Sequence, residues 1–465
     1  MNEIIPVFRK LDKSLNEEDF KFKKWYVWPM IRTQVFEEIT NEVNASKGDS
    51  KNTYIKKKNI FIFFNRLKEL FVRFPSIFNL LKKIDILIIS NEGKSEIIDN
   101  KKTNKLLWTL DKSLPKTSKA LVLNTQLTNI KDSNIPSIDL SIILSIVSRV
   151  YAFVHRKKDF SLAQGILERK IYNFFNLKIN FKFLYSNYFC RQIILAYIVR
   201  LILKIKKPKL IIFSDNGSMG AVNKLAKIEK IKTIDYQHAI TTNFHVIYDH
   251  AGSINQSYKD YLTETLFLWG RYKEEKYKKL YDCKIVGNAF FDHEESLVQS
   301  VKEDKKSILI VSDDQLTRNY LESLAKQLAT RLPHYSIFYK LRPEEFKNWR
   351  SRYSKELQEI PNIKFIENND KGLYFYLKTC KYVVGTCSSV LIEALPFSNV
   401  IVYEKGWYSI MDDYVDEEFV LSARKEKDVL NLIISDKNAK NTLDRNFLYE
   451  QNSLLRIGEL IEELC

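Results

Sequence analysis

The stretch Lys381–Glu404, KYVVGTCSSVLIEALPFSNVIVYE, contains an apolar strand, a turn of small residues and the start of a helix in direct succession. The strand is Tyr382–Val384 and the turn is Gly385–Ser389. At such a junction the first N–H groups of the helix have no backbone partner, the helix dipole favours an anion, and serine hydroxyls add donors. The stretch therefore predicts a phosphate site at Ser388 and Ser389. An ordinary N-cap role for Ser388 would explain the same pattern.

The same alternation of short apolar strands with helices extends over most of the chain. One series begins at Asp85–Ser90 and a second at Ser307–Val311, and the charged stretch 294–306 lies between them. Helical spacing predicts helices at Pro343–Leu357 and Leu443–Leu464, among others. Because strands that alternate with helices form parallel sheets covered on both faces, the predicted fold class is α/β, with two Rossmann-like doubly wound domains that face one cleft.

The length of the chain, 465 residues, is too great for a single hydrophobic core. We expect a basic helical N-terminal extension at 1–83, a first Rossmann-like domain at 84–300, a second at 301–440 and a C-terminal helix at 441–465. Hydrophobic residues make up 45% of the chain and charged residues 28%. No apolar run reaches the roughly 20 residues that span a bilayer. The N-terminus, MNEIIPVFRK, lacks the apolar core of a signal peptide, so we expect a cytoplasmic protein.

The chain is strongly basic, with 74 Lys and Arg against 57 Asp and Glu and a net charge of +17. Such a surface attracts nucleic acid, anionic lipid headgroups or phosphorylated substrates. In the stretch Lys56–Lys83 apolar residues recur at helical spacing with Lys and Arg between them. This pattern predicts a basic amphipathic helix that lies on an anionic membrane, or alternatively a helix packed on the main body with its lysines extended to solvent.

Polar side chains follow two successive strands of the first series. Asp215 comes after the strand that ends at Phe213, and His238 comes after the strand that ends at Tyr236. Either residue could act as a general base toward a hydroxyl, and histidine has the better ordinary pKa for that role. A helix N-cap at Asp215 and a buried, hydrogen-bonded loop histidine at His238 are the structural alternatives. The five cysteines and six histidines show no metal-ligand spacing, so no metal site is expected.

Four strands of the second series also end in polar loops, which we expect at one edge of one sheet. Their inventory of cations, hydroxyls and carboxylates suits a nucleoside phosphate, with the cations neutralising a departing phosphate. For each of these polar residues there is a structural alternative: a carboxylate could cap a helix, and a cation could simply be exposed on the surface. The candidate phosphate ligands are Ser312, Lys340, Arg342, Ser388 and Ser389. The candidate nucleoside ligands are Pro343, Asn368 and Glu393, of which Glu393 is placed for a ribose.

Five segments together resemble bacterial surface-polysaccharide glycosyltransferases of the GT-B type, which build capsules and O-antigens. They are YQHAITTN (236–243), LFLWG (266–270), VGNAFFD (286–292), KLRPEEF (340–346) and GTCSSVLIEA (385–394). The resemblance is more distant to CDP-glycerol glycerophosphotransferases and to bacterial sialyl- and Kdo-transferases. Three positions depart from the family pattern: Ala239 replaces a glycine, Ala289 a proline and Arg342 a histidine.

The resemblance implies a nucleotide-sugar donor, linked through CMP, CDP, UDP or GDP, in the C-terminal domain. It implies a glycan or lipid-linked acceptor against the N-terminal domain, at the inner face of the cytoplasmic membrane. It also implies a metal-independent reaction with no cofactor beyond the nucleotide sugar as co-substrate. In agreement, the pairs Asp313–Asp314 and Asp412–Asp413 lack the spacing of a DxD motif.

Two other functions remain open at this stage. One is a nucleotide-sugar epimerase of the same fold, which would interconvert free nucleotide sugars without an acceptor. The other is a non-catalytic basic protein that binds a membrane surface or nucleic acid. No RNA-binding or zinc-finger pattern supports the nucleic-acid alternative, so no nucleic-acid partner is expected.

Overall fold

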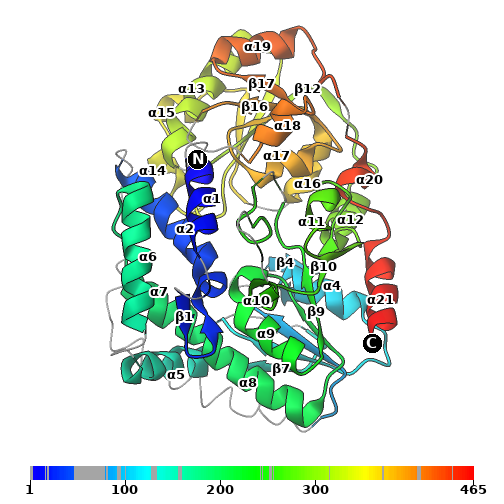
Figure 1. Ribbon diagram of the computed structural model, residues 1–465. Helices are drawn as coiled ribbons and strands as arrows, with labels where there is room; N and C mark the ends of the chain where they lie inside the picture. The colour runs from blue at the N-terminus through cyan, green and yellow to red at the C-terminus, as the bar shows by residue number, and fades with distance from the viewer. Residues whose placement is uncertain are drawn as a thin grey trace.

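The computed structural model describes residues 4–15, 17, 20–46, 79, 82–91, 96–99, 101–126, 133–155, 160–240, 242, 244–250, 254, 256–313, 315–368, 371–405, 410–441 and 443–465. The chain forms two lobes, one above the other in Figure 1, and each lobe is built around a parallel β-sheet with helices on its faces. The fold class expected from the sequence, α/β with two Rossmann-like domains, is confirmed. Most of the segment Lys56–Lys83, where an amphipathic helix is predicted, lies outside the described residues.

The sheet of the first lobe has seven strands in the order β11-β10-β9-β8-β3-β6-β7. All its neighbouring strands run parallel. The central strand β3 is buried along its whole length, as expected for a parallel strand covered on both faces. The strands are β3 (Ile86–Ser90), β6 (Ala120–Asn124), β7 (Ser137–Asp139), β8 (Leu210–Phe213), β9 (Lys232–Tyr236), β10 (Thr265–Leu268) and β11 (Asp282–Ile285).

The sheet of the second lobe has six strands in the order β14-β13-β12-β15-β16-β17, again all parallel. The predicted strand Tyr382–Val384 is the centre of β15. The strands are β12 (Asp304–Val311), β13 (Ser336–Lys340), β14 (Ile363–Ile366), β15 (Cys380–Gly385), β16 (Asn399–Tyr403) and β17 (Leu421–Ala423).

The N-terminal segment shares the hydrophobic core of the first lobe. Phe8 and Trp28 are buried together with Ile211 of the sheet. The guanidinium of Arg32 binds both carboxylate oxygens of Asp12, at 3.0 and 2.9 Å, and the two side chains are almost fully buried. The elements of this segment are α1 (Ile4–Ser14), β1 (Lys21–Phe22), β2 (Trp25–Tyr26) and α2 (Val27–Ser46).

The helices cover the two sheets and the far end of the first lobe. Those of the first lobe are α4 (Lys105–Ser113), α5 (Ser141–Val154), α6 (Phe160–Phe175), α7 (Phe181–Leu184), the π-helical η3 (Tyr185–Phe189), α8 (Cys190–Lys206), the 3-10 turn η4 (Asn216–Ser218), α9 (Gly220–Ile228), α10 (Gln256–Lys259), α11 (Glu274–Tyr277) and α12 (Ala289–Leu297). Those of the second lobe are α13 (Gln315–Arg331), α14 (Trp349–Arg352), α15 (Lys355–Gln358), α16 (Gly372–Thr379), α17 (Ser389–Ala394), α18 (Asp412–Asp416) and α19 (Glu426–Ile434). A short antiparallel pair, β4 (Glu96–Ile98) and β5 (Lys101–Thr103), completes the set. Among the described helices none is long and apolar enough to cross a membrane.

The C-terminal segment crosses back from the second lobe to the first. It forms α20 (Arg445–Leu448) and α21 (Ser453–Leu464), and α21 packs on α4 and α12. Gly270 and Gly287 permit this crossing, because a Cβ atom would lie 2.4 Å from the backbone of Leu448 at Gly270 and 2.2 Å from the Glu450 carbonyl oxygen at Gly287. Two segments of the resemblance, LFLWG and VGNAFFD, therefore owe their glycines to chain packing.

Two predicted helices are wrong in extent. The single helix expected at Pro343–Leu357 is two short helices, α14 and α15, because the buried carboxylate of Glu345 draws the first part of this segment inward as a turn. The helix expected at Leu443–Leu464 is interrupted between α20 and α21. There the chain passes the first lobe and Asn452 adopts a left-handed backbone conformation with φ of 59°.

Candidate functional site

Asp215 and His238 lie at the same edge of the first sheet. Asp215 follows β8 and His238 lies two residues beyond β9, and these strands are parallel neighbours. The carboxyl ends of neighbouring parallel strands meet at one edge, which is where open α/β sheets bind ligands. The structure thus brings the two predicted residues into one region.

The carboxylate of Asp215 is held by two side chains. Its Oδ2 accepts hydrogen bonds from Asn91 Nδ2 at 2.9 Å and from Ser218 Oγ at 2.7 Å. Asn91 directly follows β3, the strand beside β8. Asp215 precedes η4 but makes no capping hydrogen bond from its side chain. Asp215 thus occupies the N-cap position of η4, but its carboxylate is bound by Asn91 and Ser218 instead of capping the turn.

His238 is accessible to solvent, which contradicts the alternative of a buried loop histidine. The surrounding protein still displaces enough water to lower the pKa of its imidazole, while the negative charge of Asp215 acts in the opposite direction. The loop that carries it is fixed by Gln237, whose Nε2 donates to the Ala239 carbonyl at 2.8 Å and whose Oε1 accepts from the Trp269 N–H at 2.9 Å. The imidazole is thus neutral near pH 7 and able to accept a proton.

Two acidic residues at this edge were not found from the sequence. Asp235, the penultimate residue of β9, is fully buried, and its Oδ2 accepts the N–H of Asn216 at 3.1 Å. Burial raises the pKa of this carboxyl well above its usual value, and the charge of Asp215 raises it further. Glu37 of α2 also has a raised pKa, because surrounding protein displaces water and Asp215 lies nearby. Asp235 and Glu37 reach this edge through contacts between segments that are far apart in the sequence, and a single sequence does not reveal such contacts.

The helix α2 reaches this edge directly. A Cβ atom at Gly217 would lie 2.8 Å from Thr33 Oγ1 and 3.1 Å from Asp215 Oδ1. Gly217 therefore has to lack a side chain, because α2 approaches the backbone closely at this position. The sequence predicted only that 1–83 is basic and helical, which gave no indication of Thr33 or Glu37.

His250 of the same region has a structural role. His250 lies between the hydroxyls of Tyr258 and Tyr281, at 3.0 and 3.1 Å. Asp249 pairs with Arg9 and Lys276, at 2.8 and 2.9 Å. Within the described part of the chain no group of three or more acidic, histidine or cysteine side chains could hold a metal ion.

In the second lobe the four predicted loops also share one edge, since β14, β13, β12 and β15 are consecutive parallel strands. Ser388 caps α17 by accepting the Val390 N–H at 3.3 Å, so the N-cap interpretation is correct for this residue. The neighbouring Ser389 is exposed. The Ser388 hydroxyl keeps its own proton available for donation to a ligand.

The turn before α17 is tied to the next loop by Asp313. Its Oδ2 accepts from the Thr386 hydroxyl at 2.5 Å and from the Cys387 N–H at 3.0 Å. Two donors of the small-residue turn, the Thr386 hydroxyl and the Cys387 N–H, are therefore already engaged by a carboxylate of the chain. A phosphate at this turn would meet Ser388 and Ser389 rather than Cys387.

Ser312 and Lys340 lie deeper than the sequence suggested. The Ser312 hydroxyl is buried and donates to Glu345 Oε2 at 2.6 Å, and the same oxygen accepts the Arg342 N–H at 2.9 Å. Lys340 is buried, and its ammonium lies 5.0 Å from the centre of the Phe346 ring. Burial lowers the pKa of Lys340, and Glu345 opposes this effect. These two side chains support the loop from within and do not stand at the surface of the edge.

The remaining candidates stand at the surface of the same edge. Arg342 has a side chain that is 46% exposed and a loose ion pair with Glu344 at 3.7 Å, so its guanidinium is available to an anion. Pro343 and Asn368 are exposed on neighbouring loops. Glu393 is partly buried in α17, where its Oε2 accepts the Tyr374 hydroxyl at 2.7 Å.

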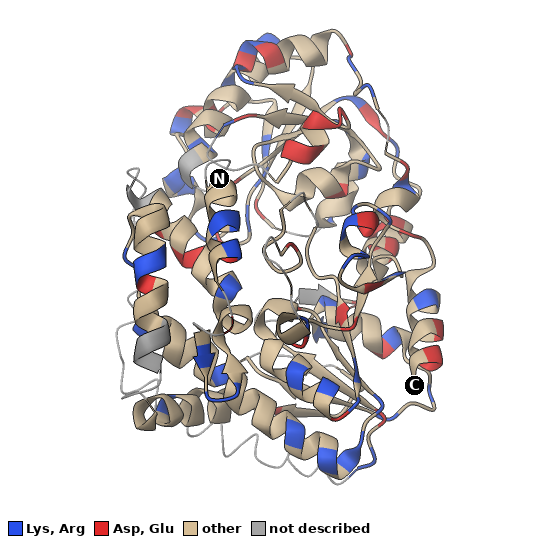
Figure 2. Ribbon diagram, viewed as in Figure 1, with Lys and Arg blue, Asp and Glu red and all other residues tan. Residues whose placement is uncertain are grey.

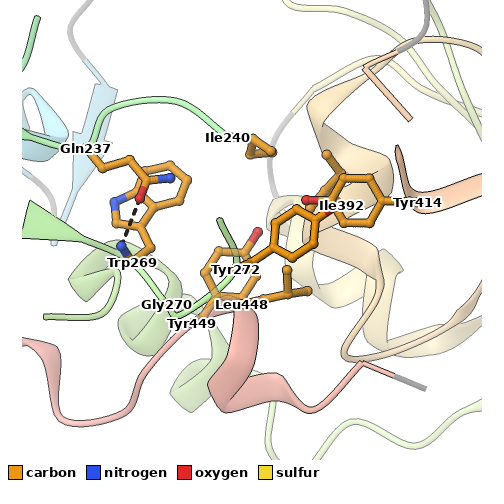
Figure 3. A pocket seen from close by; sticks show the side chains of 9 residues that line it. All are labelled: Gln237, Ile240, Trp269, Gly270, Tyr272, Ile392, Tyr414, Leu448 and Tyr449. Carbon is orange, nitrogen blue, oxygen red and sulfur yellow. Dashed lines mark hydrogen bonds between the residues drawn. The ribbon is translucent and has the colours of Figure 1, made fainter. Parts of the chain in front are cut away.

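The two edges meet at a small cavity of about 20 Å³ between the lobes, shown in Figure 3. It is lined by Gln237, Ile240, Trp269, Gly270, Tyr272, Ile392, Tyr414, Leu448 and Tyr449. Ile240 lies two residues beyond His238, and Ile392 directly precedes Glu393. The cavity has room for about one water molecule and not for a nucleotide. It does establish that the loop after β9 and the helix α17 face each other across the lobe junction.

No protein-family model matches the chain, and no curated protein matches it in sequence. Solved structures with a similar fold include the UDP-GlcNAc 2-epimerase of Methanocaldococcus jannaschii, with a TM-score of 0.49 and 13% identity over 81% of this chain and 99% of that one. The Neisseria meningitidis UDP-GlcNAc 2-epimerase bound to UDP-GlcNAc gives a TM-score of 0.46 and 13% identity, with the same coverage. A structure described as the glycotransferase of kitacinnamycin gives a TM-score of 0.46 and 11% identity, over 82% of this chain and 99% of that one.

Proposed function

We propose that the chain is a glycosyltransferase that moves a sugar from a nucleotide-sugar donor to a hydroxyl of a glycan or lipid-linked acceptor. The observation that supports this most is the pairing of two sheet edges across one junction. Asp215 and His238 lie on one edge, and Arg342, Ser388 and Ser389 on the other. One edge offers a proton acceptor and the other offers donors for a departing phosphate.

In this proposal the first lobe holds the acceptor. The neutral imidazole of His238 takes the proton of the attacking hydroxyl as the new glycosidic bond forms. The carboxylate of Asp215, held by Asn91 and Ser218, then stabilises the imidazolium, since its charge favours protonated His238. In the alternative assignment Asp215, and not His238, takes the proton of the attacking hydroxyl.

The second lobe holds the donor. Arg342 and the hydroxyls of Ser388 and Ser389 bind the phosphate on which negative charge develops as the sugar departs. Arginine can hold two phosphate oxygens at once but cannot donate a proton to them, so the leaving group departs as the anion. Glu393 binds the ribose, and Pro343 and Asn368 line the nucleoside. Ser312 and Lys340 keep the Arg342 loop in place through Glu345. No cofactor is needed in this scheme, and no metal ion is assigned.

The biological setting proposed for this reaction is the assembly of a capsule or O-antigen at the inner face of the cytoplasmic membrane. The support for this setting is the resemblance of the five segments quoted above. The acceptor would then be a growing glycan on a lipid carrier, which suits the net charge of +17 near anionic lipid.

The test is an assay of donor hydrolysis and sugar transfer with CMP-, CDP-, UDP- and GDP-linked sugars. We expect His238→Ala and Arg342→Ala each to lower the rate by about 100-fold or more, in the range found for loss of a general base or an anion-binding donor. Arg331→Ala is the matched control, because Arg331 is an exposed arginine of the same lobe at the end of α13, away from the ligand-binding edge. Wild-type rates in His238→Ala, Arg342→Ala and Ser388→Ala would overturn the proposal.

The same assay separates transfer from epimerisation. An epimerase converts one free nucleotide sugar into another with no acceptor present, and the product keeps its nucleotide. A transferase releases the nucleotide and needs an acceptor or water. Formation of a new nucleotide sugar without nucleotide release would replace the proposed function by the epimerase alternative.

A further inference from the structure

An exposed apolar surface lies on the first lobe at the end farthest from the second lobe, where α5 and α8 run along the lower border of Figure 1. Its most exposed members are Phe153 at 81% and Ile205 at 73%. We use the name basal surface for the apolar side chains Val147, Val150, Phe153, Val154, Leu201 and Ile205, each of them at least 40% exposed. Single exposed apolar residues are common on proteins, but six on two adjoining helices are not.

The spacing of these residues is that of helix faces. On α5 the exposed residues recur at Val147, Val150 and Val154, while Leu144, Ser148 and Ala152 on the opposite side are buried. On α8 Leu201 and Ile205 are one turn apart. Each helix thus buries one apolar face and leaves a second apolar face in solvent.

The two exposed faces are connected. The helices α5 and α8 pack against each other. The exposed apolar residues of α5 and α8 therefore belong to one pair of packed helices at the same end of the lobe (Figure 1).

The charges carried by the two helices themselves are of one sign, although Arg200 of α8 pairs with Glu229 at 3.1 Å. The helices α5 (SIILSIVSRVYAFV) and α8 (CRQIILAYIVRLILKIK) contain no acidic residue. Arg149, Lys204 and Lys207 are exposed beside the apolar side chains. The ammonium of Lys24 lies 5.2 Å from the centre of the Tyr197 ring. Figure 2 shows Lys and Arg along the end of α8 and on the neighbouring α9 and β1–β2 hairpin.

We propose that the basal surface docks the protein on a lipid bilayer that contains anionic lipids. Apolar side chains bordered by Lys and Arg match the acyl boundary and the negative headgroups of such a bilayer, respectively. Docking on a partner protein would not require positive residues all around the apolar side chains. An anionic membrane favours such a positive border. The proposal concerns this surface alone and holds whether or not the chain transfers a sugar.

The experiment is sedimentation of the full-length protein with vesicles of phosphatidylcholine alone or mixed with phosphatidylglycerol. We expect binding to the mixed vesicles that weakens with salt, and little binding to phosphatidylcholine alone. Lys204→Ala is expected to weaken the partition coefficient by about fivefold, the effect of one basic residue near such a surface. Phe153→Glu and Leu201→Glu are expected to weaken it by about tenfold or more, since each removes apolar contact and adds a repelled charge.

The matched control is Leu455→Glu. Leu455 lies on α21 and is 62% exposed, as is Leu201, but it is not part of the basal surface. This variant is expected to bind vesicles as the wild type does, and all variants should keep the wild-type melting temperature because the changed side chains face solvent.

Three results would overturn the proposal. The first is absence of wild-type binding to the mixed vesicles. The second is binding that survives both Phe153→Glu and Leu201→Glu, which would place the contact elsewhere, such as the predicted amphipathic segment Lys56–Lys83. The third is a wild-type dimer in solution that Leu201→Glu dissociates without any change in vesicle binding, which would assign the surface to a second copy of the chain.

Discussion

The carboxylate of Asp313 lies 2.5 Å from the hydroxyl of Thr386 and joins the loop after β12 to the loop after β15. The same oxygen accepts the Cys387 N–H at 3.0 Å. Asp313 directly follows Ser312, which donates to Glu345, and Glu345 accepts the Arg342 N–H. The contact of Asp313 with Thr386 therefore connects the turn that precedes Ser388 and Ser389 to the Arg342 loop.

Replacing Asp313 should therefore loosen this turn. Asp313→Ala leaves the Thr386 hydroxyl and the Cys387 N–H without their acceptor, and the free energy of unfolding should fall by about 1–3 kcal/mol. Asp313→Asn keeps an acceptor oxygen and should lose less. Urea denaturation of both variants measures this, with Asp428→Ala on the surface helix α19 as the control. Equal losses in Asp313→Ala and the control would contradict the role given to Asp313.

The glycines of the crossing segment give a second prediction. Gly287 has φ of +84°, and a Cβ atom there would lie 2.2 Å from both the Glu450 carbonyl oxygen and Ser453 Oγ. Gly287→Ala should displace α21 from the first lobe and lower the melting temperature by several degrees. Gly165→Ala in α6 is the control, because nothing lies within 4 Å of its Cβ position and alanine favours a helix by about 0.5–1 kcal/mol. Calorimetry should therefore show opposite signs for the two variants.

The sequence predicted the parts that depend on local pattern. The strands predicted at Asp85–Ser90 and Ser307–Val311 end where β3 and β12 end, and the predicted strand Tyr382–Val384 lies within β15, because an apolar run is sufficient to define them. The positions of Asp215, His238 and Ser388 after strands were predicted for the same reason, since strand ends are visible in sequence and neighbouring parallel strands align their ends.

The parts that depend on distant packing could not be predicted. Pro343 is a good start for a helix, but Glu345 turns inward to bind Ser312 and the Tyr353 hydroxyl, and this network is invisible in the sequence. A polar residue at a strand end can face either the interior or the ligand, and Lys340 and Ser312 face the interior. Glu37 comes to the first edge only because α2 packs beside η4.

Two partly buried histidines, His245 and His250, predict how stability depends on pH. Burial lowers the pKa of His250 to about 3 against an ordinary value of 6.5, and the nearby charge of Arg32 adds to this effect. Between these values the unfolded chain binds a proton that the folded chain does not, so stability falls as pH falls below about 6.5, by up to roughly 1.4 kcal/mol per pH unit. His245 acts in the same direction, with a pKa lowered to about 3.

His250→Gln removes one of these titrating groups and keeps a hydrogen-bonding side chain between Tyr258 and Tyr281. Urea denaturation at several pH values between 7.5 and 5 should show a shallower loss of stability on acidification in this variant than in the wild type. The same change at the exposed His334 should leave the wild-type slope unchanged. An identical slope in all three proteins would exclude His250 as a source of the pH dependence.

The pairing of Asp215 with His238 predicts the pH dependence of the reaction under the proposed function. The pKa of His238 is lowered by the surrounding protein, so the base is neutral at pH 7 and the rate should fall only on acidification below the ordinary histidine range. The negative charge of Asp215 acts in the opposite direction, because it raises the pKa of the imidazole. Asp215→Asn should therefore move the acid limb of the pH–rate profile to lower pH while it lowers the maximal rate, because the imidazolium loses its counter-charge. A shift of the acid limb to higher pH, or a limb that persists in His238→Gln, would show that a group other than this histidine carries the proton.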